Sequence, residues 1–442
     1  MSILIKNGTI VTMNAQRDVI QGDILIEDDR ISQIGTINGA EAEHIIDARD
    51  MLVIPGLIQA HIHLCQVLFR GMADDMELLD WLRLRIWPLE SSHDADSLYY
   101  SALLGCCELL RGGTTSVIDM ATVRHSNSVF EAVSRAGIRY MGGKCLMDCG
   151  TGVPPVMIDN RDKALEESLD LIKRWQGQEQ GRIKYTFCPR FVVSCSEPLL
   201  RDVARLSGQY NIPVHTHASE NLGEVELVKK ERGLPNVKYL DSLGFCNEKL
   251  ILAHCVHLDE EEMRILAANH CNIVHCPSAN LKLASGIAPI PPLLGLGASI
   301  SLGADGAPCN NNLNMFMEMR LAALIHKPSH GPVSMPALQV FEMATLGGAR
   351  AMGMEAEIGS LEVGKKADLA VINLDNWHSR PLGTAGVYTQ LVYQTQAADV
   401  YATIVDGRLL MLNGRILSLD TDEVKKNSET ALKRVANRAG ML

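Results

Sequence analysis

Two histidines separated by a single residue, His61 and His63, follow an apolar segment that begins at Pro55. Alternate side chains of a β-strand point to the same side, so both imidazoles can face one metal ion. Imidazole suits zinc and similar divalent metals. An H-x-H pair can arise by chance among 14 histidines, but the pattern predicts that this strand end anchors a metal site.

Three further segments place polar residues where an apolar run ends: His215 with His217, then His254, then Asp305. A lone histidine at a strand end is more often a structural residue than a ligand, but these four ends together supply a full set of metal ligands. Three histidines and an aspartate leave room for a water whose pKa the metal lowers towards neutral pH. The set indicates a metal-dependent hydrolase.

Two residues beside these ends could move protons or stabilise charge. Glu220 follows His217 by three residues, and a carboxylate there could carry a proton from the water to a leaving group. By itself, Glu220 would be interpreted as a solvated loop residue or a helix N-terminal charge. His254 is a candidate to stabilise charge that develops on the attacked centre.

A second metal ion usually needs a further ligand, such as a modified lysine, at the end of the fourth strand. That end reads Cys188-Pro189-Arg190-Phe191, and Lys184 stands at the start of the strand. We therefore expect one divalent metal ion per chain, with zinc favoured and iron also compatible with the ligand types.

The middle of the chain must position these residues, and its pattern alternates short apolar strands with amphipathic helices. This rhythm predicts an α/β fold, a TIM-type (β/α)8 barrel with its active site at the carboxyl ends of the strands. The expected strands cover residues 52–64, 115–120, 138–147, 183–191, 212–217, 250–256, 272–277 and 299–305. The expected helices include residues 96–111, 163–176, 197–209, 221–231, 259–269 and 313–326.

Both ends of the chain alternate apolar and polar residues, a pattern typical of β-strands. We expect residues 1–54 and 357–420 to form one small β-sandwich domain beside a barrel of residues 55–356. Residues 421–442 predict a C-terminal amphipathic helix.

Composition limits the possible partners and location. The net charge of −11 over 442 residues argues against nucleic acid, whose recognition needs a basic surface. The 12 cysteines lack zinc-knuckle spacing and fit a reducing cytoplasm. We see neither a signal peptide nor an apolar run long enough for a membrane span. A homo-oligomer, a dimer or larger, is expected because such assemblies are common among enzymes of this kind.

Over nearly its whole length, the sequence resembles the amidohydrolase superfamily. The resemblance rests on residues 53–63, on Gly112-Gly113-Thr114-Thr115, on residues 359–369 and on the order of the ligands. It is strongest for aminohydrolases of purines and related N-heterocycles. That branch implies a mononuclear zinc or iron site with ligands His61, His63, His217 and Asp305, with Glu220 as proton shuttle and His254 as electrostatic partner.

Several segments resemble guanine deaminases, above all Pro189-Arg190-Phe191 and residues 143–148, 215–221 and 275–281. In that family the residues matching Gln66, Arg190 and Phe191 contact the base. An arginine can donate to a lactam carbonyl, an amide can donate and accept, and a phenyl ring can pack on the base. Taken singly, Arg190 would be interpreted as a rim salt bridge and Phe191 as core packing.

Residues 303–311 and 70–75 instead resemble deaminases of methylthioadenosine and S-adenosylhomocysteine, and the triazine hydrolases near them. Trp81 and Glu90 occur in both groups, and in the nucleoside deaminases the residue matching Glu90 holds the ribose. Those enzymes usually carry a histidine where Arg190 stands.

The sequence therefore predicts hydrolytic deamination of an aminated purine, with guanine to xanthine and ammonia as the first hypothesis. Gln66, Trp81, Glu90, Arg190 and Phe191 are the expected substrate-binding residues, and Glu220, His254 and Asp305 the expected catalytic ones. The alternatives are a methylthioadenosine, S-adenosylhomocysteine or 5'-deoxyadenosine deaminase, and a triazine hydrolase. A non-catalytic barrel protein is disfavoured because the ligand and shuttle positions are all occupied by suitable residues.

Overall fold

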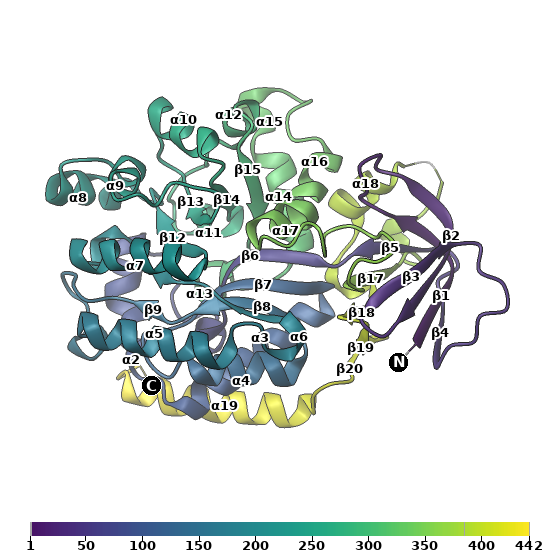
Figure 1. Cartoon of the computed structure of the whole chain (residues 1–442), viewed down its shortest axis with the longest axis horizontal. Helices are drawn as coiled ribbons and strands as arrows, with labels where there is room; N and C mark the ends of the chain where they lie inside the picture. Colours follow the sequence, from purple (N-terminus) through teal and green to yellow (C-terminus); the bar gives the residue numbers. More distant parts are fainter. Residues whose placement is uncertain (1, 384, 442) are drawn as a thin grey trace.

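A ring of eight parallel strands forms the body of the protein in the computed structural model, which describes residues 2–383 and 385–441 (Figure 1). One arc runs in the order β10-β8-β7-β6 and the other in the order β12-β13-β14-β15. A bridge between Phe187 and Val214 joins the arcs on one side, and β16 (Asp305–Gly306) pairs with β6 on the other. The barrel strands are β6 (Leu57–His63), β7 (Thr114–Met120), β8 (Arg139–Gly143), β10 (Ile183–Tyr185), β12 (Val214–Ala218), β13 (Leu250–His254), β14 (Asn272–His275) and β15 (Ser299–Leu302).

Helices follow the strands and cover the outside of the barrel. Every residue of β6 and β7 is buried, as expected for parallel strands with both faces covered. In α4, Val129, Phe130, Val133 and Ala136 form the buried face, and the helix ends at Gly137 with a φ of 89°. The main helices are α3 (Ala95–Arg111), α4 (Asn127–Ala136), α5 (Arg161–Trp175), α7 (Glu197–Tyr210), α8 (Leu222–Arg232), α10 (Glu260–Ala268), α12 (Ile290–Gly295) and α14 (Met315–Ile325).

The two chain ends form a small domain beside the barrel, on the right in Figure 1. Its strands belong to one continuous hydrogen-bonded sheet, in which β5 pairs antiparallel with β17. Buried isoleucines and valines such as Ile5, Ile24 and Val371 form its core. The strands are β1 (Ser2–Val11), β2 (Val19–Glu27), β3 (Arg30–Gly35), β4 (His44–Asp47), β5 (Met51–Pro55), β17 (Leu369–Asn373), β18 (Val400–Val405), β19 (Arg408–Leu412) and β20 (Arg415–Ile416).

The single strand expected over residues 52–64 is wrong, because the chain breaks at Gly56 into β5 of the small domain and β6 of the barrel. A Cβ atom at Gly56 would lie 2.1 Å from the Thr115 side chain, so only glycine allows this turn. Residues 138–147 and 183–191 also split, and the short strands β9 (Cys145–Leu146) and β11 (Cys188–Pro189) pair with each other. An unbroken apolar pattern does not reveal where a strand changes partner.

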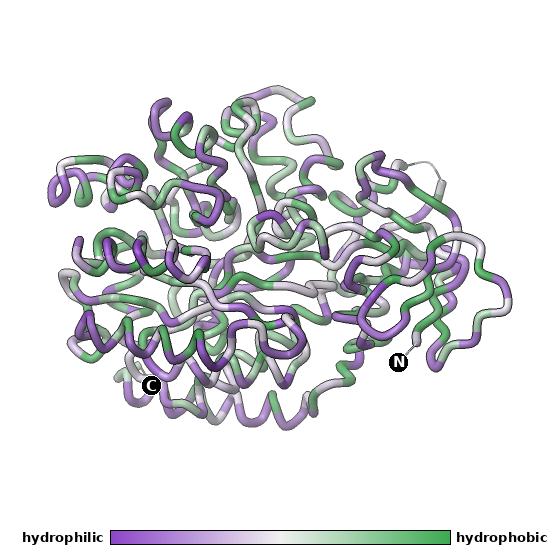
Figure 2. The backbone as a smooth tube through the Cα atoms, viewed as in Figure 1, coloured by the Kyte–Doolittle hydropathy of each residue, from purple (hydrophilic) through white to green (hydrophobic). Residues whose placement is uncertain are grey.

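The last helix, α19 (Thr421–Arg438), lies along the barrel beside α3 (Figure 1). Most of its residues are hydrophilic (Figure 2), and its buried face includes Val424, Ala431 and Val435. The Ser428 hydroxyl donates to the carbonyl of Tyr100 on α3 at 3.2 Å. Among the helices of the described residues, none is long and apolar enough to cross a membrane.

Candidate metal centre and active site

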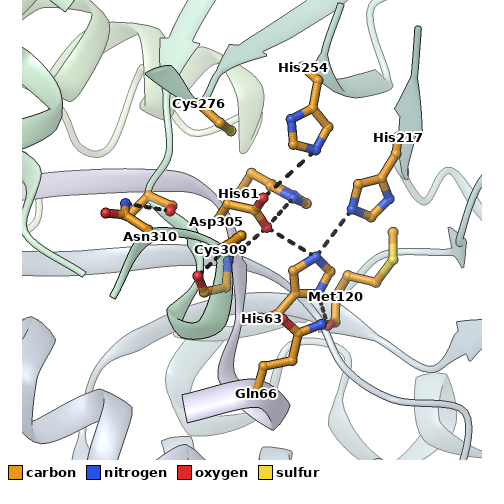
Figure 3. Close-up of polar contacts among 12 residues, drawn as sticks. His61, His63, Gln66, Met120, His217, His254, Cys276, Asp305, Cys309 and Asn310 are labelled. Atoms are coloured by element: carbon orange, nitrogen blue, oxygen red, sulfur yellow. Dashed lines mark hydrogen bonds and ion pairs between the residues drawn. The ribbon is translucent and has the colours of Figure 1, made fainter. Parts of the chain in front are cut away.

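Four barrel strand ends bring imidazoles and a carboxylate to one point (Figure 3). His61 and His63 extend from β6, His217 from β12 and Asp305 from β16. Asp305 Oδ1 lies 3.2 Å from His61 Nε2 and 3.3 Å from His63 Nε2. The Nε2 atoms of His63 and His217 lie 3.2 Å apart. His254, at the end of β13, approaches the same carboxylate, with its Nε2 4.0 Å from Asp305 Oδ2.

The protonation of two histidines is determined by backbone carbonyls. His63 Nδ1 lies 2.9 Å from the Met120 carbonyl, and His217 Nδ1 lies 2.7 Å from the Arg190 carbonyl. A carbonyl only accepts hydrogen bonds, so each Nδ1 carries the proton and each neutral Nε2 carries a lone pair. Two lone pairs then face each other across 3.2 Å. This arrangement fits a cation between the imidazoles.

The charges also fit a metal centre. Burial lowers the pKa of His61 to about 4 and the pKa of His63 below its usual value, so both are neutral near pH 7. Burial alone would raise the pKa of Asp305, but the imidazoles of His61, His254 and His63 outweigh burial and bring it well below its usual range. Neutral imidazoles and an ionised carboxylate are the forms that bind zinc.

Two residues of the centre hold left-handed backbone conformations. The φ angles are 75° at His254 and 62° at Asp305. Non-glycine residues rarely adopt such angles, and strain of this kind gathers at functional sites. Nearby, a Cβ at Gly303 would lie 2.6 Å from the His61 carbonyl oxygen, so a glycine is needed for the chain to pass His61 and present Asp305.

Glu220 and His254 lie together at the edge of this centre. His254 Nε2 is 3.5 Å from Glu220 Oε2, and His254 Nδ1 is 2.9 Å from Asn280 Oδ1. Burial raises the pKa of Glu220 well above its usual value, and the carboxylates of Asp305 and Glu224 raise it further. A buried carboxyl with a raised pKa is suited to carrying a proton near neutral pH.

A buried polar network joins Arg190 and Gln66, which line a cavity beside the centre, to Glu90 behind them. Arg190 Nη1 donates to Glu90 Oε2 at 2.6 Å, and Nη2 donates to Glu90 Oε1 at 3.3 Å. Gln66 Nε2 donates to Glu90 Oε1 at 2.7 Å. Burial alone would raise the pKa of Glu90, but the Arg190 guanidinium outweighs burial and lowers it. An ionised carboxylate only accepts, so the Gln66 nitrogen gives one N–H to Glu90, and the buried Gln66 Oε1 has no hydrogen-bond partner among the described residues.

A cavity that is partly open to solvent adjoins the centre. Its metal-side wall includes His63, His217, Glu220, His254 and Asp305. Its other walls are mainly apolar and come from Leu78, Trp81, Leu82, Phe191 and Leu283, with Gln66 and Arg190 beside them. This mixture of an apolar wall and a few polar groups is typical of a small-molecule site.

The structure thus brings together every residue that the sequence singled out. His61, His63, His217 and Asp305 converge, Glu220 and His254 lie beside them, and Gln66, Trp81, Arg190 and Phe191 line the cavity. Glu90 is 4 % exposed and lies behind Gln66 and Arg190.

Sequence reasoning missed the roles of Asn280, Glu224 and His215. Asn280 lies 2.9 Å from His254, and Glu224 accepts a hydrogen bond from the Glu220 amide at 2.8 Å. His215 contacts His61. The H-x-H spacing of His215 and His217 repeats that of His61 and His63, and this was the available signal for His215.

Comparison with known proteins gives one family match, in which a model of the amidohydrolase family covers residues 52–410. A 5-methylthioadenosine/S-adenosylhomocysteine deaminase of Syntrophomonas wolfei is 39% identical over 441 residues, 98% of this chain and 100% of that protein. A 5'-deoxyadenosine deaminase of Methanosarcina acetivorans is 38% identical over 440 residues, 99% of each chain.

Solved structures show the same fold. An adenosine deaminase from Xanthomonas campestris with bound zinc superposes with a TM-score of 0.91 at 29% identity, covering 98% of each chain. Guanine deaminase of E. coli gives a TM-score of 0.81 at 27% identity, covering 93% of this chain and 98% of that one. The expectation of a deaminase is supported, and the adenosine-type alternative is favoured over guanine, which was the first hypothesis.

Proposed function

Since the chain belongs to the amidohydrolase family and is a hydrolase of carbon–nitrogen bonds, we propose that it deaminates an adenosine-type nucleoside altered at its 5' position. The candidates are 5'-deoxyadenosine, 5-methylthioadenosine and S-adenosylhomocysteine, which the names of its relatives contain. In this reaction water adds to the amino-bearing ring carbon, the carbon–nitrogen bond breaks, and ammonia leaves a ring carbonyl behind.

The similarity of the whole chain to deaminases named for these nucleosides is the observation that carries this choice. A guanine lactam presents a carbonyl that needs a hydrogen-bond donor. Each terminal nitrogen of Arg190 and the amide nitrogen of Gln66 donate one N–H to Glu90, which leaves fewer donors for such a carbonyl.

We propose His61, His63, His217 and Asp305 as the ligands of one divalent ion, with zinc favoured because structural neighbours contain it. A zinc ion held there supplies a nucleophile at neutral pH, because it lowers the pKa of bound water. The orienting carbonyls of Met120 and Arg190 hold two of the imidazoles in the ligand form.

The remaining residues act on the proton and on the substrate. Glu220 takes a proton during attack and delivers it to a substrate nitrogen, a role suited to its burial beside His254. His254 hydrogen-bonds the oxygen that adds to the ring, and Asn280 orients its imidazole. Trp81 and Phe191 pack on the purine and, with Leu78, Leu82 and Leu283, keep water away from the substrate.

An ammonia-release assay on the zinc-loaded protein tests the proposal. We expect turnover of 5'-deoxyadenosine or 5-methylthioadenosine with kcat/KM at least about 100-fold above guanine, because a site built for one hydrogen-bond pattern leaves the other substrate unpaired. Guanine remains the comparison of most interest, since Arg190 and Phe191 do line the cavity. Preferred turnover of guanine would overturn the assignment. A Glu220→Gln protein with full zinc content controls for contaminating deaminases.

A further inference from the structure

His215 is a fully buried histidine that extends from β12 towards His61, deeper in the barrel than His217. Its Nε2 lies 2.8 Å from His61 Nδ1, and its own backbone amide is held by the Phe187 carbonyl at 2.8 Å. The two rings meet edge to face, with an interplanar angle of 83°. The other nitrogen of His215, Nδ1, has no hydrogen-bond partner in the part of the chain that the structure describes. His61 is thus the polar group that engages this imidazole.

The contact restricts where the His61 proton can lie. Two neutral imidazole nitrogens at 2.8 Å share one proton, so one ring donates and the other accepts. His61 Nε2 faces the centre, 3.2 Å from Asp305 Oδ1. It can offer a lone pair there only if its own proton lies on Nδ1. His215 must then accept that proton's hydrogen bond through its Nε2.

His61 therefore differs from the other two imidazoles of the centre. His63 and His217 are held by backbone carbonyls, which no substitution removes and which accept in every state. His61 depends on a side chain that can either accept or donate. Its tautomer, and with it the lone pair at Nε2, is set by the identity of residue 215.

We propose that His215 is a positioning residue, which holds His61 in the tautomer that binds the metal and thereby sets the affinity of the centre. The proposal rests on the ligand set given under Proposed function. His215 does not line the cavity, and it acts through its contact with His61. This role explains why an imidazole is buried here although its Nδ1 has no hydrogen-bond partner among the described residues. Leaving a buried polar atom unpaired costs free energy, which an apolar side chain at this position would not cost.

Three substitutions distinguish the effect of the hydrogen-bond acceptor at residue 215 from the effect of side-chain volume. In His215→Gln, the amide oxygen reaches the position of Nε2 and can accept from His61. In His215→Asn, the same amide is one carbon too short to reach. His215→Leu fills the space without an acceptor. His275→Leu is the matched control, because His275 is also fully buried, on the nearby strand β14, and has no hydrogen-bond partner among the described residues.

The measurement is the zinc dissociation constant of each metal-free protein, obtained by competition with a chromophoric chelator. We expect zinc binding about 10- to 100-fold weaker in His215→Leu and His215→Asn, the range seen when a ligand-orienting partner is lost. His215→Gln and His275→Leu should stay within about threefold of wild type, because the first keeps the acceptor and the second lies outside the contact. The visible spectrum of the cobalt(II) proteins should change in the same two variants.

Wild-type zinc affinity in both His215→Leu and His215→Asn would overturn the proposal, as would equal weakening in His215→Gln. Thermal unfolding of the metal-free proteins shows whether each variant is folded, and if His215→Leu is not, the Asn and Gln pair decides the question. If the wild-type protein itself binds no zinc, the ligand set fails, and that result is distinct from a failure of the role given to His215.

Discussion

Asp119 is a fully buried carboxyl near the metal centre, and its replacement by asparagine should remove a pH dependence of folding. Asp119 Oδ1 accepts from the Leu64 amide at 2.7 Å, and Oδ2 accepts from the Tyr140 hydroxyl at 2.8 Å. Burial raises the pKa of Asp119 from 3.8 to about 7, against the lowering effect of these two hydrogen bonds. An asparagine can keep the bond from Leu64 and donate its own N–H to the Tyr140 oxygen.

The size and sign follow from linkage between protonation and folding. A pKa increase of about 3 corresponds to about 4 kcal/mol, at 1.36 kcal/mol for each pKa unit. Because the folded protein holds this proton more tightly than the unfolded chain, its stability falls as the pH rises from about 4 to about 7. Above about pH 7 the loss of stability caused by the buried carboxylate no longer changes with pH. The Asp119→Asn protein has no ionisable group at this position and does not show this loss.

The assay is urea unfolding of the metal-free wild type and Asp119→Asn at pH 5, 6, 7 and 8, followed by circular dichroism. We expect the stability of Asp119→Asn relative to wild type to increase by about 2 to 4 kcal/mol between pH 5 and pH 8. Asp170→Asn, at an exposed position of α5, is the control and should show no such trend. A constant difference between wild type and Asp119→Asn would refute the reasoning, because it would mean that Asp119 is ionised at pH 5.

Three further outcomes follow from the site. Glu220→Gln should lower kcat by about 10²- to 10⁴-fold, the usual contribution of a general acid–base group, while zinc content stays at the wild-type level; retained turnover would exclude Glu220 as the shuttle. Arg190→Met should lower the free energy of unfolding by about 3 to 5 kcal/mol because it leaves the Glu90 charge buried and unpaired, and adding Glu90→Gln should recover a large part of this loss in the double variant. Removal of metal by a chelator should abolish ammonia release and lower the melting temperature, and excess zinc should restore both, because a ligand that binds only the folded state stabilises it.

Strand ends made most of the site predictable. His61, His63, His217 and Asp305 each follow an apolar run, and parallel strands of a barrel bring their carboxyl ends to one face. The order of the strands along the chain was therefore enough to predict that these residues converge. The barrel and the small domain could be predicted for the same reason, since the change from alternating to βα patterning is visible along the chain.

Pairings between distant side chains could not be predicted in this way. Glu90 and Arg190 are 100 residues apart, and nothing in the pattern around either indicates that one neutralises the other. The same holds for Gln66, whose amide was expected both to donate and to accept towards the base, whereas its nitrogen gives one N–H to Glu90 and its oxygen is buried. The domain boundary was expected between residues 54 and 55, but the break of the expected strand 52–64 at Gly56 was missed, because the segments on both sides of it are buried.

That boundary has a consequence for how the protein folds during synthesis. β5 leads through Gly56 directly into β6, which carries His61 and His63, but the partner of β5 is β17 near the other end of the chain. β16, which brings Asp305 to β6, is also made late. β6 must therefore wait for about 240 residues beyond His63 to be translated before β16 can pair with it, and contacts this distant slow folding and leave strand edges exposed meanwhile. The proposed ligands His63 and Asp305 can come together only after that interval.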